Sequence, residues 1–247
     1  MKRAISNIIS SIVSSELRSS ELLVGDVPVT LRRSPRARRL RLRVDPRTRS
    51  LLLTVPPRVS QRRALAWARE QSEWVERALD ALPAGIPILP GSAIPYRGAP
   101  YRIDWDPVRP RRIDRGDGRL VAGGPLEMLA PRVLRWLRSE ALALLAEETR
   151  ALVARIDVMA PKVAVGDPVS RWGSCSSGGT IRYSWRLVMA PDFVRRATVA
   201  HEVAHLVHMN HGPDFHALVA ELNGADPRPA RLWLRREGAG LHGIGRI

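Results

Sequence analysis

Residues 198–222 read TVAHEVAHLVHMNHGPDFHALVAEL, and this stretch contains five of the chain's six histidines. Apolar residues surround the first two histidines on nearly every side of the predicted helix, which indicates that the helix is buried. Histidines and a glutamate on a buried helix need partners, because an unpaired polar group in a protein interior costs free energy. The question that decides both fold and function is which of these histidines could bind one metal ion.

The first two histidines have the spacing of a metal-binding helix. His201 and His205 are four residues apart, so on a helix they lie about 40° apart around the axis and about 6 Å apart along it. Two imidazoles placed in this way can converge on one ion. Glu202 lies between them, where its carboxylate can reach a metal-bound water without being a ligand, which is the HExxH arrangement of zinc hydrolases. The pattern predicts His201 and His205 as ligands and Glu202 as a general base.

A third ligand has to come from further along the chain. His208 lies about 10 Å along the axis from the first ligand, too far to share a tetrahedral ion with it. His211 would point away if the helix continued, but Asn210 is a candidate left-handed C-cap and a Gly-Pro pair follows, so the chain can turn back. The sequence favours His211, and His216 and Glu221 on the next predicted helix stay open as alternatives.

The composition predicts a soluble, cytoplasmic protein with a strongly positive surface. The chain has 247 residues, 45% of them hydrophobic, and no apolar run approaches the length needed to cross a bilayer, so no membrane partner is expected. The single cysteine, Cys175, cannot form a disulfide within the chain. The net charge of +16 comes almost entirely from arginine, and such an excess would attract nucleic acid, nucleotides or acidic proteins.

Arginines are concentrated between residues 32 and 49, where nine of them accompany a single acidic residue. RRLRLRV at 38–44 alternates arginine with apolar residues, Asp45-Pro46 supplies a turn, and LLLTV at 51–55 follows, which predicts a hairpin with one arginine-lined face. Both a solvated strand face and a phosphate-binding surface fit this pattern. The candidate phosphate or nucleic-acid contacts are Arg36, Arg38, Arg39, Arg41 and Arg43.

Changes in pattern divide the chain into three parts. Residues 1–24 form an amphipathic extension that need not be ordered. Residues 25–122 form a β-rich subdomain with the arginine-rich hairpin and one helix, for which Ser60 is a suitable N-cap. Residues 123–247 begin with a Gly-Gly pair and form a second domain that contains the histidine segment.

Within the second domain, a long helix is predicted ahead of several strands. Pro131 suits the first turn of this helix, and strands are expected at 162–165, 169–174 and 180–188. The inner stripe of the long helix would be Leu134, Leu137, Ala141, Leu145, Leu152 and Ile156.

Two spaced motifs in this domain resemble a known family. RWGSCSSGGTIRYSWRLVMAP at 171–191, followed by HEVAHLVHMNHGPDF at 201–215, is similar to the YgjP-like metallopeptidases and, more distantly, to SprT-like proteases through HExxH and HGPDF. The resemblance extends over most of the chain from about residue 25. Further segments that carry it are SPRARRLRLRVDP, LTVPPRVS, a tryptophan-bearing helix at 67–74 and RLWLRREG.

The resemblance implies an α+β fold: an N-terminal β-rich subdomain, then a zincin-like catalytic domain whose active-site helix packs on a small antiparallel or mixed sheet. It also implies that His201, His205 and His211 bind one zinc ion, with Glu202 as the general base. Two positions depart from the family pattern. His216 stands where relatives usually have tryptophan, which places an extra possible ligand near the metal. Ser184 stands where they have asparagine, which bears on substrate contacts at that strand.

The chemistry of such a site is peptide-bond hydrolysis by metal-activated water. Three neutral imidazoles leave one zinc position for water, whose pKa falls toward about 7. Glu202 would accept its proton and later deliver it to the leaving amine. Candidates for stabilising the charge on the carbonyl oxygen are Arg171, Tyr183 and Arg186. Cys175 could approach the zinc, but its Gly- and Ser-rich surroundings favour a turn.

Three function classes remain open from sequence. The leading one is a zinc-dependent metallopeptidase that acts on a protein or peptide. The second is a metal-dependent nucleoside triphosphate pyrophosphohydrolase in which arginines hold the triphosphate; the sequence has no phosphate-cradling glycine loop or acidic magnesium cluster to support it. The third is a nucleic-acid-associated protein whose hairpin binds DNA or RNA and whose zincin domain is secondary or inactive.

Overall fold

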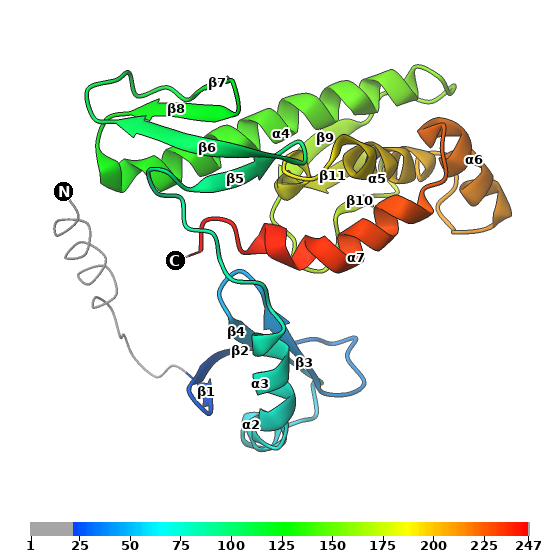
Figure 1. The fold of residues 1–247 in the computed structure, drawn as a ribbon. Helices are drawn as coiled ribbons and strands as arrows, with labels where there is room; N and C mark the ends of the chain where they lie inside the picture. The colour runs from blue at the N-terminus through cyan, green and yellow to red at the C-terminus, as the bar shows by residue number, and fades with distance from the viewer. Residues whose placement is uncertain (1–21, 247) are drawn as a thin grey trace. The chain divides into compact units, whose positions relative to one another are not determined.

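The computed structural model describes residues 22–246, and these form two units, each with a hydrophobic core of its own. The first unit contains the described residues up to Asp45 together with Arg49–Leu79. The second contains Pro46–Thr48 and the chain from Asp80 onward. The elements of both are labelled in Figure 1. Most of the extension expected at residues 1–24 lies outside the described residues.

The first unit is a four-stranded sheet with two helices. The sheet has the order β1-β2-β4-β3, with β4 parallel to β2 and antiparallel to β3. Its β3–β4 pair is the predicted arginine-rich hairpin, in which Arg41 lies opposite Thr54 and Arg43 opposite Leu52. The strands are β1 (Leu23–Val24), β2 (Val27–Arg33), β3 (Arg41–Asp45) and β4 (Ser50–Val55).

Alternation along β4 explains how this sheet makes a core. Leu51, Leu53 and Val55 are buried, whereas the residues between them are not. The helices α2 (Gln61–Arg69) and α3 (Ser72–Asp80) supply the buried Ala64, Leu65, Ala68 and Val75 that complete this core. The side chain of Ser60 accepts a hydrogen bond from Arg63 N, so the predicted N-cap is confirmed. The single helix predicted here is interrupted near Gln71, where the backbone makes a tighter turn back to Ala68.

The second unit begins with another four-stranded sheet, of order β5-β6-β8-β7. The sequence placed this segment in the N-terminal subdomain, with a boundary at 123, whereas the structure divides the chain near residue 80. The reason is that Ile94, Ile103 and Leu120 of the sheet share one core with the long helix that follows. The strands are β5 (Ala93–Tyr96), β6 (Ala99–Asp106), β7 (Asp114–Gly116) and β8 (Arg119–Gly123).

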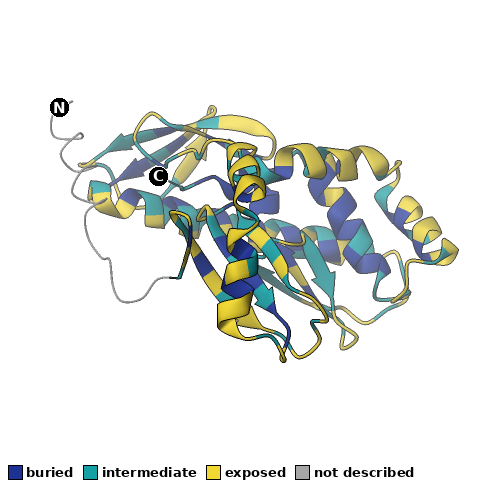
Figure 2. Ribbon diagram, turned by 90° about the horizontal axis from the view of Figure 1, so that it is seen from below, coloured by how far each residue is buried: buried dark blue, intermediate teal, exposed yellow. Residues whose placement is uncertain are grey.

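The long predicted helix is α4 (Leu129–Val153), which follows a 3₁₀ turn, η1 (Leu126–Met128). Pro131 lies in its first turn, as predicted. Figure 2 shows buried and exposed segments alternating along the helices, as expected where one face packs on a core. Leu137, Ala141 and Leu145 of the predicted stripe are buried, but the helix ends before Ile156. The full buried stripe is Leu129, Val133, Leu137, Ala141, Leu145, Thr149 and Val153.

A three-stranded mixed sheet connects α4 to the histidine segment. It consists of β9 (Lys162–Gly166), β10 (Gly173–Cys175) and β11 (Thr180–Ser184) in the order β10-β11-β9. The strand predicted to reach residue 188 stops at Ser184, because the Ser184 side chain caps a 3₁₀ helix, η2 (Trp185–Val188), by accepting from Arg186 N. The α+β class and the small mixed sheet agree with the expected fold.

Three helices complete the second unit: α5 (Asp192–Ala204), α6 (Pro213–Asn223) and α7 (Arg228–His242). Helix α5 packs against α4, α6, α7 and β10, so it lies at the centre of this unit (Figure 1). Helix α6 begins at a proline and ends at Gly224, whose φ of 68° is a left-handed conformation that suits glycine. Among the described residues, no helix combines the length and the apolar character needed to cross a membrane.

Candidate metal centre

Helix α5 ends earlier than the sequence indicated. His205 is its C-cap, with right-handed backbone angles. Two tight backbone turns follow, from Leu206 N to Val203 O and from His208 N to Ala204 O. Asn210 does not have the left-handed conformation predicted for it. The turns that directly follow α5 redirect the chain, so no C-cap at residue 210 is required.

The ring of His205 is oriented by the backbone of the same turn. Its Nδ1 lies 2.9 Å from the carbonyl oxygen of His208. Because a carbonyl oxygen can only accept, this contact requires the proton on Nδ1 and leaves Nε2 with its lone pair available to a metal. His208 therefore contributes its backbone carbonyl to the site, and its side chain lies outside the group formed by His201, His205 and His211.

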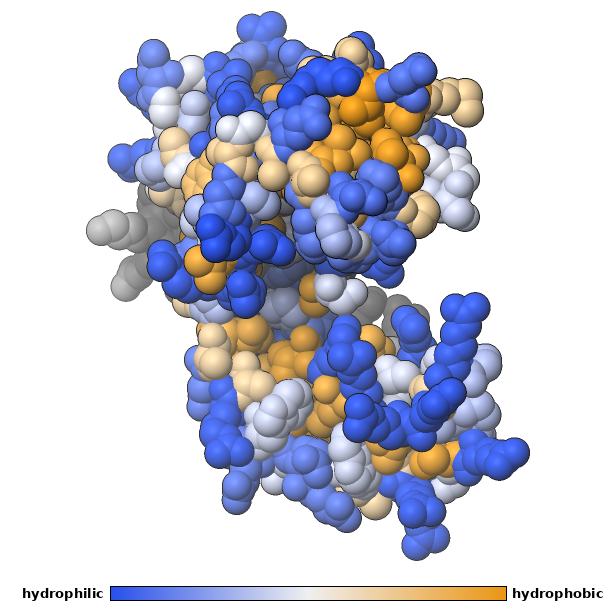
Figure 3. All heavy atoms as spheres, turned by 90° about the vertical axis from the view of Figure 1, so that its right-hand side faces the viewer, coloured by the Kyte–Doolittle hydropathy of each residue, from blue (hydrophilic) through white to orange (hydrophobic). Residues whose placement is uncertain are grey.

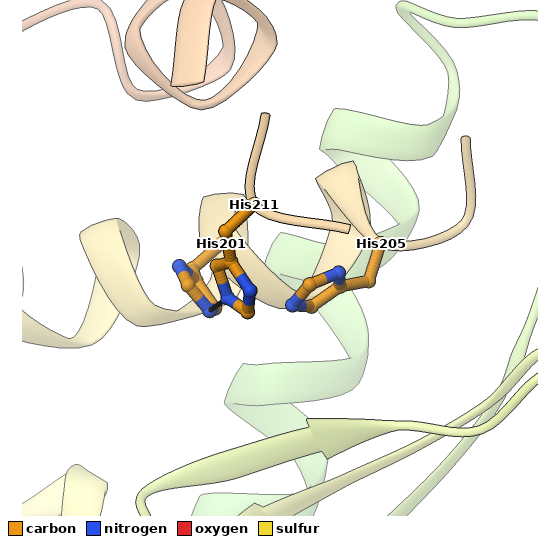
Figure 4. Close-up of side chains that lie close together, drawn as sticks. All are labelled: His201, His205 and His211. Atoms are coloured by element: carbon orange, nitrogen blue, oxygen red, sulfur yellow. Dashed lines mark hydrogen bonds between the residues drawn. The ribbon is translucent and has the colours of Figure 1, made fainter. Parts of the chain in front are cut away.

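His201, His205 and His211 lie together, with one ligand atom of each within 4.8 Å of the others. Figure 4 shows the three rings turned toward one another. His201 comes from α5, His205 is the C-cap of that helix, and His211 lies in the loop that follows. The Nε2 atoms of His201 and His211 are 3.4 Å apart. Two nitrogens bound to one zinc ion at about 2.1 Å and a tetrahedral angle would lie about 3.4 Å apart. The donor set and its spacing therefore fit a single divalent ion.

Phe215 in α6 positions all three rings. It is fully buried, and its ring centroid lies 5.0 Å from that of His201, 4.5 Å from that of His205 and 4.7 Å from that of His211. The sequence pattern assigned Phe215 no role, although the HGPDF segment contains it. Of the two alternative third ligands, His216 has its ring centroid 6.4 Å from that of His211 and lies outside the three-histidine group. Glu221 lies outside it as well.

The electrostatics of His201 favour the form that binds metals. Burial, together with the positive charge of neighbouring histidines and of Arg231, lowers the pKa of His201 to about 4. The imidazole is therefore neutral at physiological pH. A neutral imidazole has the lone pair that coordination requires.

Glu202 is buried against β10, and its place depends on a glycine. A Cβ on Gly173 would lie 2.7 Å from Cδ of Glu202, so a larger residue there would displace the carboxylate. Burial raises the pKa of Glu202 to about 7, and the charge of Arg171 and a hydrogen bond from the backbone of Cys175 oppose that rise. The carboxylate is thus fixed beside His201 with few surrounding groups to stabilise its charge.

Comparison with known families shows to which family the chain belongs. The model of the YgjP-like, metallopeptidase domain family matches residues 38–237, about four fifths of the chain. The chain belongs to the YgjP-like metallopeptidase family. Searches of curated proteins and of solved structures gave no significant match. Membership implies a metal-dependent peptidase, with a divalent ion and a peptide substrate.

The candidate transition-state contacts fall in different places within the YgjP-like domain. Arg171 is exposed and lines a pocket beside His201 and Glu202. Tyr183 is fully buried, and its hydroxyl oxygen lies 3.0 Å from Thr149 Oγ1. Arg186 is also buried, and its guanidinium donates to the carboxylate of Asp167. Of the three, the structure brings only Arg171 to the rim of the site.

Cys175 and Ser184 are near the site without joining the histidines. Cys175 ends β10, is half-buried, and its thiol lies 3.5 Å from its neighbour's carbonyl, Ser176 O. Burial and the charge of Glu202 raise the pKa of this thiol, which keeps it protonated. Ser184 is buried at the cap of η2 and does not line the pocket.

The arginines of the hairpin lie in the first unit and are exposed. Arg41 and Arg43 are on β3, and the remaining three are in the segment between β2 and β3. Hydrophilic side chains, drawn in blue, project from the surface of this unit in Figure 3. Exposure suits either a solvated face or a phosphate-binding one, so phosphate or nucleic-acid binding through these residues stays a prediction.

Proposed function

We propose that this chain is a zinc-dependent peptidase in which His201, His205 and His211 hold the ion and Glu202 is the general base. The observation that carries the proposal is the convergence of His201, His205 and His211. The buried Glu202 lies next to His201 on α5. Three imidazole ligands with the fourth position left for water are one of the donor sets of catalytic zinc sites.

The role of the ion is to supply Lewis acidity at this position: when bound, it would polarise a water molecule and the substrate carbonyl. Glu202 would hold the proton taken from water and pass it to the leaving amine. Gly173 leaves space for the carboxylate, and a hydrogen bond from the backbone of Cys175 would hold it in place for both transfers. Burial of Glu202 assists proton transfer, because it makes the carboxylate a stronger base than an exposed glutamate.

Two neighbouring residues orient the rest of the site. The His208 carbonyl fixes the proton of His205 on Nδ1, and Phe215 packs against the rings. Arg171 is the candidate donor to the carbonyl oxygen, because its side chain reaches the pocket rim next to Glu202. Its charge would stabilise the negative charge that develops during attack.

The test is product analysis by mass spectrometry. Zinc-loaded wild type and Glu202→Gln are incubated side by side with a mixture of unfolded proteins and with nucleoside triphosphates. New peptide ends made by wild type and absent with Glu202→Gln are expected. The substitution keeps the imidazoles and removes the base.

A different product would contradict the proposal. Nucleoside monophosphate and pyrophosphate formed only by wild type, without new peptide ends, would assign the chemistry to phosphorus. Equal peptide cleavage by both proteins would show that Glu202 is not the base.

A further inference from the structure

A pocket of about 260 Å³ lies beside His201 and Glu202. A site that encloses a whole small molecule typically has about 300–1,000 Å³, so this pocket suits one part of a larger ligand, such as one amino-acid side chain. Its apolar wall is formed by Trp172, Val219, Pro227, Ala230 and Leu234.

Two arginines from different elements line the same pocket. Arg171 precedes β10, and Arg231 lies in the first turn of α7. Among the described residues that line the pocket, Glu202 is the only acidic one. Within the part of the chain that the structure describes, neither guanidinium forms a salt bridge with a carboxylate.

Other arginines of the same unit, unlike these two, form salt bridges with carboxylates of the chain. The guanidinium of Arg195 contacts both Asp192 and Glu148, and that of Arg186 contacts Asp167. Those side chains are buried, so they need a carboxylate from the chain itself. Arg171 and Arg231 are exposed at the pocket, so water can solvate their charge and neither needs a carboxylate of the chain. Glu202 is the acidic group of the lining on which the charge of Arg171 acts.

We propose that this pocket binds a carboxylate of the substrate next to the scissile bond, and that Arg171 and Arg231 determine this specificity. The inference rests on the proposed peptidase function and names its substrate class. The carboxylate has two possible sources, an Asp or Glu side chain within the peptide or the free C-terminus of the peptide.

The chemistry of the lining favours this class over others. A guanidinium presents a planar fork of donors that matches a carboxylate, and a charged hydrogen bond of this kind is stronger than a neutral one. A lysine or arginine of the substrate would meet two like charges against the single carboxylate of Glu202, so the charged lining is net positive. A whole nucleoside triphosphate would exceed the volume of the pocket, whereas a glutamate side chain has an apolar stem that suits the apolar wall.

The first arm of the test measures cleavage. A peptide that wild type cuts is made with Glu, Gln, Leu or Lys in turn at each residue adjacent to the cut, and each peptide is made with a free and an amidated C-terminus. A glutamate peptide should exceed its glutamine counterpart in kcat/KM by about 10- to 100-fold at one position. A preference that persists in amidated peptides identifies the side chain as its source, and one confined to free C-termini identifies the α-carboxylate.

Variants of Arg231 connect the preference to the pocket. Arg231→Gln should reduce the glutamate preference to near unity, and Arg231→Glu should lower cleavage of glutamate peptides while raising that of lysine peptides. Arg235→Gln is the matched control, since Arg235 is an exposed arginine one turn further along α7 that does not line the pocket. Arg171→Gln should weaken the same preference and also lower kcat for every peptide.

The second arm measures binding without turnover. Labelled glutamate and glutamine peptides are titrated with zinc-loaded Glu202→Gln by fluorescence anisotropy, with and without Arg231→Gln. Tighter binding of the glutamate peptide that Arg231→Gln abolishes supports the pocket even if wild type cleaves no peptide, in which case the proposed function alone fails. Equal affinity for both peptides, or a preference that survives in Arg231→Gln, overturns the proposal and leaves the peptidase assignment intact.

Discussion

Helix α5 carries polar side chains at both of its ends. At one end these side chains are paired with opposite charges of the chain, and at the other they are not. In the first turn, Asp192 and Arg195 belong to a network in which each guanidinium meets a carboxylate of the chain. In the last turn, His201 and His205 turn toward His211, and each ring brings an electron-pair donor. At the first turn the chain supplies both charges, and the ion pairs of Arg97 and Arg195 with Asp192 and Glu148 form a structural clamp. At the last turn the chain supplies electron-pair donors alone, which makes a site for a cation.

Arg97, which forms a salt bridge with Asp192, also belongs to a turn that fixes where α5 begins. Arg97 and Gly98 form the turn between β5 and β6, and their backbone N–H groups donate to Val188 and Met189 just before α5. Gly98 has a φ of 81°, and a Cβ there would lie 2.9 Å from Cα of Pro191, so this turn requires glycine. The β5–β6 turn of the four-stranded sheet therefore holds the start of α5, and the other end of this helix carries the histidines.

The largest effect on catalysis is expected from a substitution in the last turn of α5. Glu202→Gln should lower kcat for peptide cleavage by about a thousandfold, because general-base catalysis contributes about 10²- to 10⁴-fold. Zinc content, measured by atomic absorption, should stay that of wild type. Glu221→Gln, an exposed change on α6, is the control and should retain full activity. Loss of zinc together with activity would show that Glu202 is a ligand.

A smaller loss is expected from crowding the same carboxylate. Gly173→Ala adds a Cβ 2.7 Å from Cδ of Glu202, which forces the carboxylate to move. A displacement of about 1 Å at a catalytic group can cost about 100-fold in rate. The zinc affinity should be unchanged, since no imidazole moves.

Gly178→Ala is the matched control for that substitution, because the nearest atom to its added Cβ is 3.9 Å away. Steady-state kinetics should give wild-type values for this variant. Wild-type kinetics for Gly173→Ala itself would show that the position of Glu202 does not matter to the reaction.

At the first turn, substitution should affect stability rather than chemistry. Arg195→Met leaves Glu148 and Asp192 without their shared partner, and Arg195 is fully buried. Breaking a buried ion pair by removing one partner costs about 3 kcal/mol of the free energy of unfolding. Urea denaturation should show this loss. The neighbouring Arg196 is mostly exposed, so Arg196→Met should change stability by less than about 0.5 kcal/mol. Equal effects of the two substitutions would contradict the clamp.

The smallest effect depends on pH. Hydrogen bonds from Arg97 and Arg195 hold the pKa of Asp192 well below its usual range. A carboxyl whose pKa is lower in the folded state contributes stability above its unfolded pKa of about 3.9, and that contribution disappears as the pH falls toward the folded value. Asp192→Asn should therefore be less stable than wild type by about 1 kcal/mol at pH 7 and should approach it below about pH 4. A stability difference that is constant from pH 7 to pH 3 would argue against this account.

The same division separates what the sequence could predict from what it could not. Spacing along one helix is a local property, so the shared face of His201, Glu202 and His205 followed from their positions in the chain alone. A Gly-Pro pair likewise indicated that the chain turns ahead of α6. The arginine-rich hairpin followed from the period of the apolar residues, and the α+β class followed from the resemblance to the YgjP-like family.

Contacts between segments far apart in the chain could not be predicted from the sequence. Gly173 gives space to Glu202, and Arg231 reaches the pocket from α7, but each depends on how separate elements pack. The boundary near residue 80 was missed for the same reason. In sequence, β5 to β8 are short strands like those of the first unit, and what separates the two sets is the core that each joins. Arg186 resembled a site residue in sequence, but its pairing with Asp167 places it in the interior.

The central claim is that the donors at the end of α5 hold a metal ion, and zinc-linked stability tests it most directly. Urea denaturation of metal-stripped protein is followed with and without added zinc for wild type, His211→Ala and His208→Ala. Zinc should stabilise wild type and His208→Ala alike, because a ligand that binds only the folded state raises the free energy of unfolding. It should leave His211→Ala almost unchanged. Equal stabilisation of all three proteins, or its loss in His216→Ala with His211→Ala unaffected, would contradict the assignment of the three ligands.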